Sequence, residues 1–88
     1  YFMSKNKIEL TPQIDVDAIL VAMTEKYKDE EISTIDGVKI DFESTWVHLR
    51  KSNTEPIIRI YTEAATQTEA DSLALRIIQE IKEVVSRN

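Results

Sequence analysis

The sequence predicts an α+β domain: an antiparallel sheet of about four strands with two helices packed on one face. Two stretches of the chain repeat apolar residues at helical spacing, and the stretch between them alternates apolar and polar residues with a period of two. Short polar segments separate the alternating runs, which favours hairpins and therefore antiparallel pairing. A chain of 88 residues suffices for one hydrophobic core, so we expect residues 1–88 to form a single domain.

The first helix is expected from about residue 15 to residue 28. Residues 1–10 mix apolar and polar side chains and fit either a strand or an irregular lead-in, which Thr11-Pro12 ends. Asp15 is a suitable N-cap, because its carboxylate can accept a hydrogen bond from a backbone N–H of the first turn. Apolar residues then recur at helical spacing at Val16, Ile19, Leu20, Met23 and Tyr27.

The strands are expected at residues 32–35, 38–42, 45–51 and 57–63. Between the first two lies Asp36-Gly37, a dipeptide that predicts a two-residue type I′ turn with positive φ at both central residues. A polar loop of residues 52–56, closed by Pro56, joins the last two.

The second helix is expected to begin near Thr66, because Thr66-Gln67-Thr68-Glu69 fits a capping box. An apolar stripe of more than four turns follows, formed by Ala70, Leu73, Ala74, Ile77, Ile78, Ile81, Val84 and Val85. Each helix has one apolar face to bury. We expect both helices to cover the same side of the sheet and to leave its other side open.

Composition and charge exclude several classes of site. Acidic residues outnumber basic ones by 16 to 11, and the net charge is −5, whereas general binders of nucleic acid or of anionic membranes are usually basic. The chain has no cysteine, which excludes disulfides and thiolate metal sites and fits a cytoplasmic location. No apolar run approaches the roughly 20 residues of a membrane span. We therefore expect no nucleic-acid partner, no membrane association and no metal site within this chain.

One basic segment runs against this acidic balance. Between Trp46 and Ile60 lie Arg50, Lys51 and Arg59 with a single acid, Glu55. If Val47, Leu49, Ile58 and Ile60 point toward the helices, alternation puts Arg50 and Arg59 together on the open face.

These residue types suit an anion. A guanidinium group binds phosphate or carboxylate with two parallel hydrogen bonds, and the loop between the strands adds side-chain donors from Ser52, Asn53 and Thr54. The residues alone therefore leave two interpretations open: a site for one compact dianion, or ordinary solvated arginines beside a turn.

Other interpretations of the open face also stay open. Trp46, His48 and Tyr61 share it with the arginines, as in a stand-alone module that binds RNA or another anionic partner on its sheet, although the acidic balance argues against this. His48 fits either a donor that supports the groups binding an anion from behind, or a surface histidine. Asp15 and Asp17 resemble the start of a metal loop, but a helix N-terminus also favours acids, and no third ligand follows.

A longer motif resembles a known family. Residues 50–59 read Arg-Lys-Ser-Asn-Thr-Glu-Pro-Ile-Ile-Arg and are followed by Glu63-Ala64. This resembles the signature R-x-S-(N/G)-T-E-P-x-x-R of the C-terminal domain of the α-D-phosphohexomutase superfamily. Residues 36–39 (Asp-Gly-Val-Lys), Trp46-Val47 and Asn53 resemble its phosphomannomutase/phosphoglucomutase branch in particular. The resemblance implies the TATA-binding-protein-like fold of the fourth and last domain of such an enzyme.

The resemblance also implies a division of labour. Enzymes of this superfamily interconvert hexose 1-phosphates and 6-phosphates through a bisphosphate intermediate. A phosphoserine in the first domain and a Mg²⁺ ion held by an aspartate loop of another domain carry out the chemistry. Both would lie outside these residues, so that the domain alone should be inactive, with no catalytic residue and no cofactor of its own. Its partners would be the hexose phosphate substrate and the other domains of the same chain.

The C-terminal domain of such enzymes holds the substrate phosphate that is not reacting. Matched to the motif, the residues expected to contact that phosphate are Arg50, Ser52, Asn53, Thr54 and Arg59. Glu55 and Pro56 would shape the loop, and Glu55 could pair with an arginine. Lys51 occupies a variable position of the motif.

Overall fold

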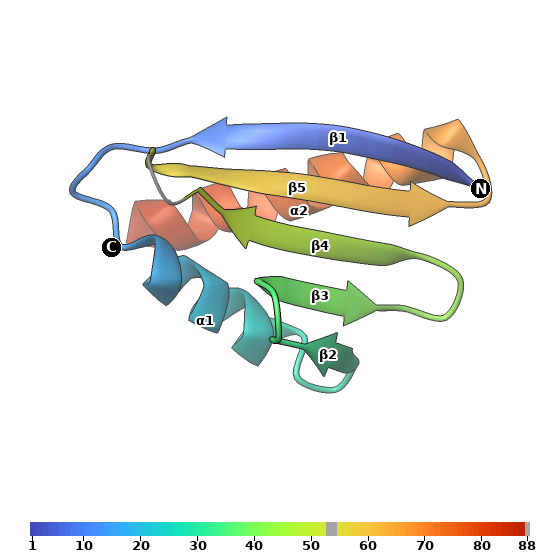
Figure 1. Cartoon of the computed structure of the whole chain (residues 1–88), viewed down its shortest axis with the longest axis horizontal. Helices are drawn as coiled ribbons and strands as arrows, with labels where there is room; N and C mark the ends of the chain where they lie inside the picture. Colours follow the sequence, from blue (N-terminus) through green and yellow to red (C-terminus); the bar gives the residue numbers. More distant parts are fainter. Residues whose placement is uncertain (53–54, 88) are drawn as a thin grey trace.

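The computed structural model describes residues 1–52 and 55–87 and confirms an α+β fold, with both helices on one face of an antiparallel sheet (Figure 1). The sheet has five strands in the order β1-β5-β4-β3-β2. Among the described helices, none is long and apolar enough to cross a membrane. The elements along the chain are β1 (Phe2–Glu9), α1 (Val16–Lys26), β2 (Glu31–Ser33), β3 (Val38–Asp41), β4 (Trp46–Lys51), β5 (Ile57–Ala64) and α2 (Gln67–Arg87).

The core lies between the sheet and the two helices. As alternation predicts, Val47 and Leu49 of β4 and Ile58 and Ile60 of β5 are all fully buried. They form one apolar cluster with residues of both helices, namely Ile19, Leu20 and Met23 of α1 and Leu73, Ile77 and Ile81 of α2. Burying a side chain of this size contributes about 1.5–3 kcal/mol. The opposite face of the sheet carries most of the charged residues of the strands, among them Arg50 and Arg59.

The first segment of the chain is a full edge strand. β1 pairs antiparallel with β5 along its whole length, from Phe2 opposite Ala64 to Glu9 opposite Ile57. This resolves the choice between a strand and an irregular lead-in, and it adds a fifth strand to the expected sheet of about four. Mixed composition hid the strand, because one side of β1 packs near α2 and the other side is exposed.

Both helices begin as their sequences predict. The Asp15 carboxylate accepts a hydrogen bond from the Ala18 backbone N–H at 3.2 Å, which confirms it as the N-cap of α1. At the start of α2, the Thr66 hydroxyl oxygen accepts one from the Glu69 N–H at 3.1 Å. These bonds satisfy donors that the first turn of a helix leaves without a partner.

The predicted type I′ turn is wrong. The connection between β2 and β3 spans residues 34–37, and of the described residues only Gly37 has a positive φ, of 69°. A Cβ atom on Gly37 would lie 2.2 Å from the carbonyl oxygen of Leu49 in β4. Glycine is therefore required here by a close approach between two backbones as well as by its φ. Packing against β4 sets the shape of this loop, and that contact is invisible to a local turn rule.

Tyr27 joins three elements at one edge of the core. It is the C-cap of α1, its hydroxyl donates to the Glu80 carboxylate of α2, and it accepts a hydrogen bond from Arg76 Nη2 at 3.0 Å. Its ring meets that of Phe42, which follows β3, edge to face at 5.5 Å between centroids. Burial, and next the hydrogen bond with Glu80, raise the pKa of the Tyr27 hydroxyl above its ordinary value of 10.0.

We expect Tyr27→Phe to lower the free energy of unfolding by about 1–2 kcal/mol at neutral pH, because Glu80 and Arg76 lose a shared partner. A raised pKa means that the folded state binds the hydroxyl proton more tightly than the unfolded state. The contribution of Tyr27 is therefore complete below pH 10 and is lost as the pH rises through the folded-state pKa.

Urea unfolding of the wild type and of Tyr27→Phe, followed by circular dichroism between pH 7 and pH 11, checks this. The difference between the two proteins should shrink above pH 10. Tyr61→Phe, on the open face of the sheet, is the control and should change little. Equal stability of wild type and Tyr27→Phe at pH 7 would contradict the role of this hydroxyl.

Candidate functional site

The two arginines of the motif lie directly opposite each other. The register of β4 and β5 pairs Arg50 with Arg59, and both side chains are exposed on the face of the sheet away from the helices. This confirms the placement that alternation predicts. Like charges directly opposite each other destabilise a sheet, so a negative charge close to both arginines would be stabilising.

Backbone hydrogen bonds hold both ends of the loop that joins the two arginine strands. The Ser52 N–H donates to the Ile57 carbonyl at 3.2 Å, and the Ile57 N–H donates to the Glu55 carbonyl at 2.8 Å. The Leu10 N–H donates to the Pro56 carbonyl at 2.7 Å, which ties the loop to the segment after β1. The loop therefore starts and ends at fixed points beside the arginine pair.

The remaining motif residues are placed as follows. Ser52 is half-buried at the start of the loop. Asn53 and Thr54, the other expected phosphate contacts, lie outside the described residues. Glu55 is exposed, and its side chain forms no ion pair with any residue that the structure describes. Its backbone carbonyl helps to shape the loop by accepting the hydrogen bond from the Ile57 N–H. The expected pairing of Glu55 with an arginine is thus absent from the described part of the chain.

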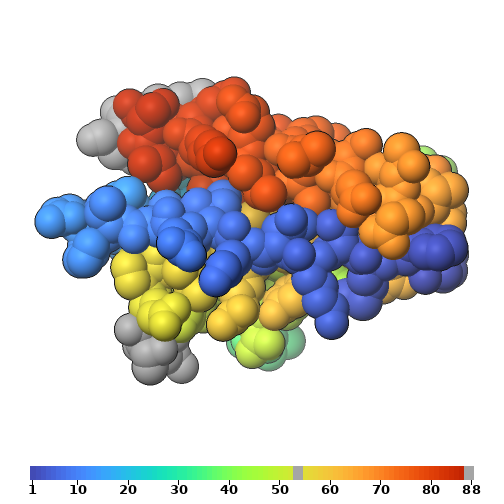
Figure 2. Space-filling view, turned by 90° about the horizontal axis from the view of Figure 1, so that it is seen from above, coloured from blue at the N-terminus to red at the C-terminus, as the bar shows by residue number. Residues whose placement is uncertain are grey.

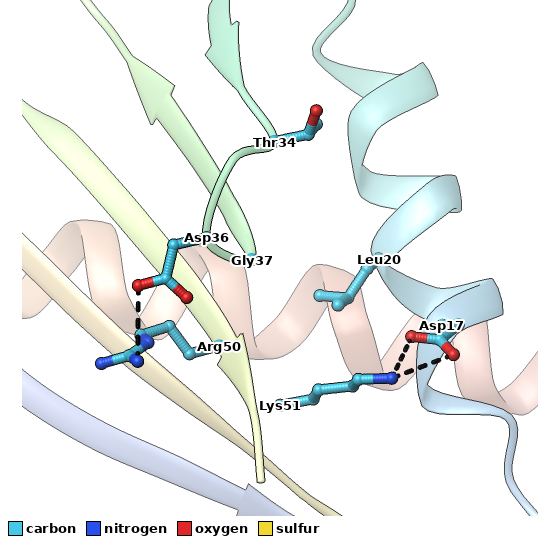
Figure 3. Close-up of a pocket in the computed structure, with 7 residues that line it drawn as sticks. All are labelled: Asp17, Leu20, Thr34, Asp36, Gly37, Arg50 and Lys51. Atoms are coloured by element: carbon cyan, nitrogen blue, oxygen red, sulfur yellow. Dashed lines mark hydrogen bonds and ion pairs between the residues drawn. The ribbon is translucent and has the colours of Figure 1, made fainter. Parts of the chain in front are cut away.

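Arg50 instead pairs with an acid from another loop. Its Nη2 lies 3.4 Å from Asp36 Oδ2, and Figure 3 shows the two side chains meeting beside β4. The Asp36 carbonyl also accepts a hydrogen bond from His48 Nε2. Together with the close approach of Gly37 to Leu49, these contacts fasten the loop of residues 34–37 to three successive residues of β4.

Asp36 is the residue of this site that sequence reasoning missed. A turn dipeptide explains an aspartate before a glycine without any reference to Arg50, and the contact spans 14 positions along the chain. Alternation gives the face on which Arg50 lies but says nothing about which loop returns to it. His48 is likewise neither a direct part of the arginine pair nor a free surface side chain, since it holds the Asp36 backbone.

Lys51 points to the other side of β4 and does not belong to the arginine pair. Its Nζ donates to both carboxylate oxygens of Asp17, at 2.8 and 3.1 Å, at the start of α1 (Figure 3). Between the two ion pairs lies a hollow of about 350 Å³, bounded by the first turns of α1 and the loop of residues 34–37. Lys51 therefore connects β4 to α1.

Within residues 1–52 and 55–87, no three His, Cys, Asp or Glu side chains gather where they could share a metal ion. The two acids considered as the start of a metal loop have other roles: Asp15 caps α1, and Asp17 binds Lys51. The geometry of the site thus offers cations and backbone donors for an anion. Of its described acids, Asp15 caps a helix and Asp17 and Asp36 each pair with a basic side chain.

Comparison with known proteins identifies the family. A sequence profile of the phosphoglucomutase/phosphomannomutase C-terminal domain matches residues 7–80, which is most of the chain and includes the whole arginine motif. The chain belongs to this family. The fold, the motif and the profile match therefore agree.

The relatives of the chain carry names from more than one branch of the superfamily. Over 87 residues it is 39% identical to a phosphoglucosamine/phosphogalactosamine mutase of Sulfurisphaera tokodaii, covering 97% of the chain and 18% of that protein. Over 83 residues it is 35% identical to a phosphoglucomutase/phosphomannomutase of Thermococcus kodakarensis, covering 91% and 18%. A probable phosphoglucosamine mutase of Methanopyrus kandleri is 34% identical over 82 residues, covering 85% and 18%. The chain thus spans less than a fifth of the length of these mutases.

We expect Gly37→Ala to lower the free energy of unfolding by about 2 kcal/mol or more, because the new Cβ would collide with the Leu49 carbonyl and the φ of this position disfavours alanine. Chemical denaturation measures the loss. Ile35→Ala is the matched control, since that side chain lies in the same loop and is 97% exposed, and it should stay within about 0.5 kcal/mol of the wild type. If both variants are equally stable, the loop is not fixed by its packing on β4.

Proposed function

We propose that this chain is the C-terminal domain of a phosphohexomutase and that it holds the phosphate group of the hexose phosphate that is not reacting. The observation that carries the proposal is the direct pairing of Arg50 with Arg59 at the ends of the strands that lead into and out of the motif loop. An arginine on each side of one loop can bind the same small dianion from two directions.

The chemistry of the pair favours phosphate. Two exposed guanidinium groups supply ten N–H donors, and a phosphate monoester offers three strong acceptor oxygens. A dianion between them also removes the repulsion that the register creates. Asp36 neutralises part of Arg50 in the described structure, and the planar guanidinium has donors left for a second acceptor.

The catalytic groups belong elsewhere in the proposed enzyme. The phosphoserine and the Mg²⁺ ion that the family resemblance implies would be supplied by other parts of the mutase. The described residues of this chain would take no direct part in the transfer of the phosphoryl group. Interactions with the distant phosphate would position the hexose for reaction at its other end, which is how remote binding energy accelerates a reaction.

The substrate class is the hexose phosphates. The names of the relatives include glucosamine, galactosamine, glucose and mannose derivatives, which share a phosphate on a hexose ring. A site built on the phosphate is common to all of them. The choice among hexoses would then be made by groups outside the arginine pair.

A stand-alone module that binds RNA on its open face is not favoured. The net charge is −5, and the two large aromatic residues of β4 and β5 are not neighbours in the register, since Trp46 lies opposite Glu63 and Tyr61 opposite His48. The Trp46 ring already has Lys39 Nζ at 5.1 Å from its centroid. Single-stranded RNA would need an accessible row of stacking rings and a broad basic surface.

We expect Arg50→Ala and Arg59→Ala, made in the full-length mutase that contains this chain, each to lower kcat/KM for a hexose 1-phosphate by about 10- to 100-fold, because each removes charge-assisted hydrogen bonds to the phosphate. Steady-state kinetics with glucose 1-phosphate and mannose 1-phosphate checks this. Arg59→Lys should lose less than Arg59→Ala, since it keeps the charge but not the fork.

Lys82→Ala provides the control, because this exposed lysine lies on α2, away from the arginine face. It should leave the kinetics unchanged. A double variant Arg50→Ala/Arg59→Ala that folds and retains the wild-type kcat/KM would overturn the proposal.

A further inference from the structure

A third cation stands in line with the two arginines. Lys7 of β1 lies opposite Arg59 of β5, and Arg59 lies opposite Arg50 of β4. The three residues form one row across three neighbouring strands, on the face of the sheet away from the helices. Because strands are spaced by about 4.8 Å, the outer two backbones are only about 10 Å apart, within reach of two long side chains that converge on one group.

The surface between β1 and β5 is open to a ligand. A shallow hollow there is lined by Lys5, Asn6, Lys7, Arg59 and Tyr61. Figure 2 shows β1 in blue across the middle of the view, with α2 in orange and red above it and part of β5 in yellow below it. Arg59 therefore lies between the motif loop on one side and the lysines of β1 on the other.

Lys7 is available to an incoming anion. Its Nζ lies 3.6 Å from Glu9 Oε1, but the two side chains are 57% and 74% exposed. An ion pair this exposed contributes little, at most about 1 kcal/mol. The Arg59 side chain forms no hydrogen bond or ion pair with any other residue that the structure describes, although its backbone is part of the sheet. A dianion placed over Arg59 would therefore meet two cations that are held weakly or not at all by the described residues.

Charge becomes more positive over three successive rows of the open face, ending at the row of Lys7; beyond it, the last row of β1 and β5 pairs Glu9 with Ile57. Two rows further along the strands, the aligned residues are Met3, Glu63, Trp46, Asp41 and Glu31, which carry three acids and no base. The row between them holds Lys5, Tyr61, His48, Lys39 and Ser33. An anion is thus repelled by the row of Glu63 and attracted to the row of Lys7.

We propose that Lys7 is a third cationic ligand of the substrate phosphate, supplied by β1 and lying outside the arginine motif. The two guanidinium forks fix the orientation of the phosphate, and the ammonium adds a point charge to an oxygen that the forks leave exposed. Such a ligand strengthens binding of a dianion and has no part in the reaction at the other end of the sugar. This inference rests on the proposed function of the arginine pair.

The test uses Lys7→Gln in the full-length mutase, with Lys39→Gln as the matched control. Lys39 is a lysine on the same open face and lies two strands from Arg59 in the middle row. We measure KM and kcat for glucose 1-phosphate, the inhibition constant of inorganic phosphate, and thermal stability. Lys7→Gln should raise KM and the inhibition constant about three- to tenfold, with kcat within twofold and stability unchanged. Lys7→Arg should restore both constants, and Lys39→Gln should change neither.

The other outcomes separate this inference from the proposed function. If Arg59→Ala is impaired and Lys7→Gln is not, the third ligand is wrong and the arginine site stands. If neither variant changes the kinetics, both proposals fail. Equal effects of Lys7→Gln and Lys39→Gln would mean that any positive charge on the open face attracts the substrate through its electrostatic field. A fall in kcat at constant KM would mean that Lys7 has a role other than phosphate binding. Either result overturns the assignment.

Discussion

The register between β4 and β5 is the constraint on which both the core and the candidate site depend. Two successive residue pairs of these strands point in opposite directions. Leu49 and Ile60 face the buried side of the sheet, and Arg50 and Arg59 face the open side. A slip of one residue would turn arginines into the core and isoleucines into water. The apolar cluster under the sheet therefore fixes the positions of the two guanidinium groups above it. Stability and the proposed anion recognition both depend on this one alignment.

The same register brings positive charges together, and the surrounding structure compensates for them. Asp36 reaches Arg50 from a loop that Gly37 holds against β4, and Asp17 reaches Lys51 from the start of α1. Each basic residue at the end of β4 thus has its own acid, supplied by a different element. The acidic net charge of the chain includes these local partners, so a low overall charge is compatible with a cationic site.

Local patterns predicted a large part of this arrangement. Period and capping residues indicated both helices, and alternation placed Arg50 and Arg59 on one face, because these features depend only on nearby sequence. The edge strand β1 was ambiguous because its residues pair with residues of β5 that lie 48 to 62 positions further along the chain. The turn at Gly37 was predicted incorrectly because its conformation depends on close packing against the Leu49 carbonyl of β4. Asp36 meets Arg50, and Lys7 is aligned with Arg59, only through such long-range contacts, so no local rule could place either residue beside the arginines.

The carboxylate beside Arg50 has a consequence for how an anion would leave. An arginine that already has a partner exchanges one ion pair for another when phosphate arrives, so the net gain is the difference between the two. In a mutase of the proposed kind, the bisphosphate intermediate must let go of this site, turn, and return with its other phosphate. A resident counter-ion makes that departure easier, since Asp36 can take back the guanidinium as the phosphate withdraws. Moderate affinity at the proposed site would then suit an intermediate that has to be held twice.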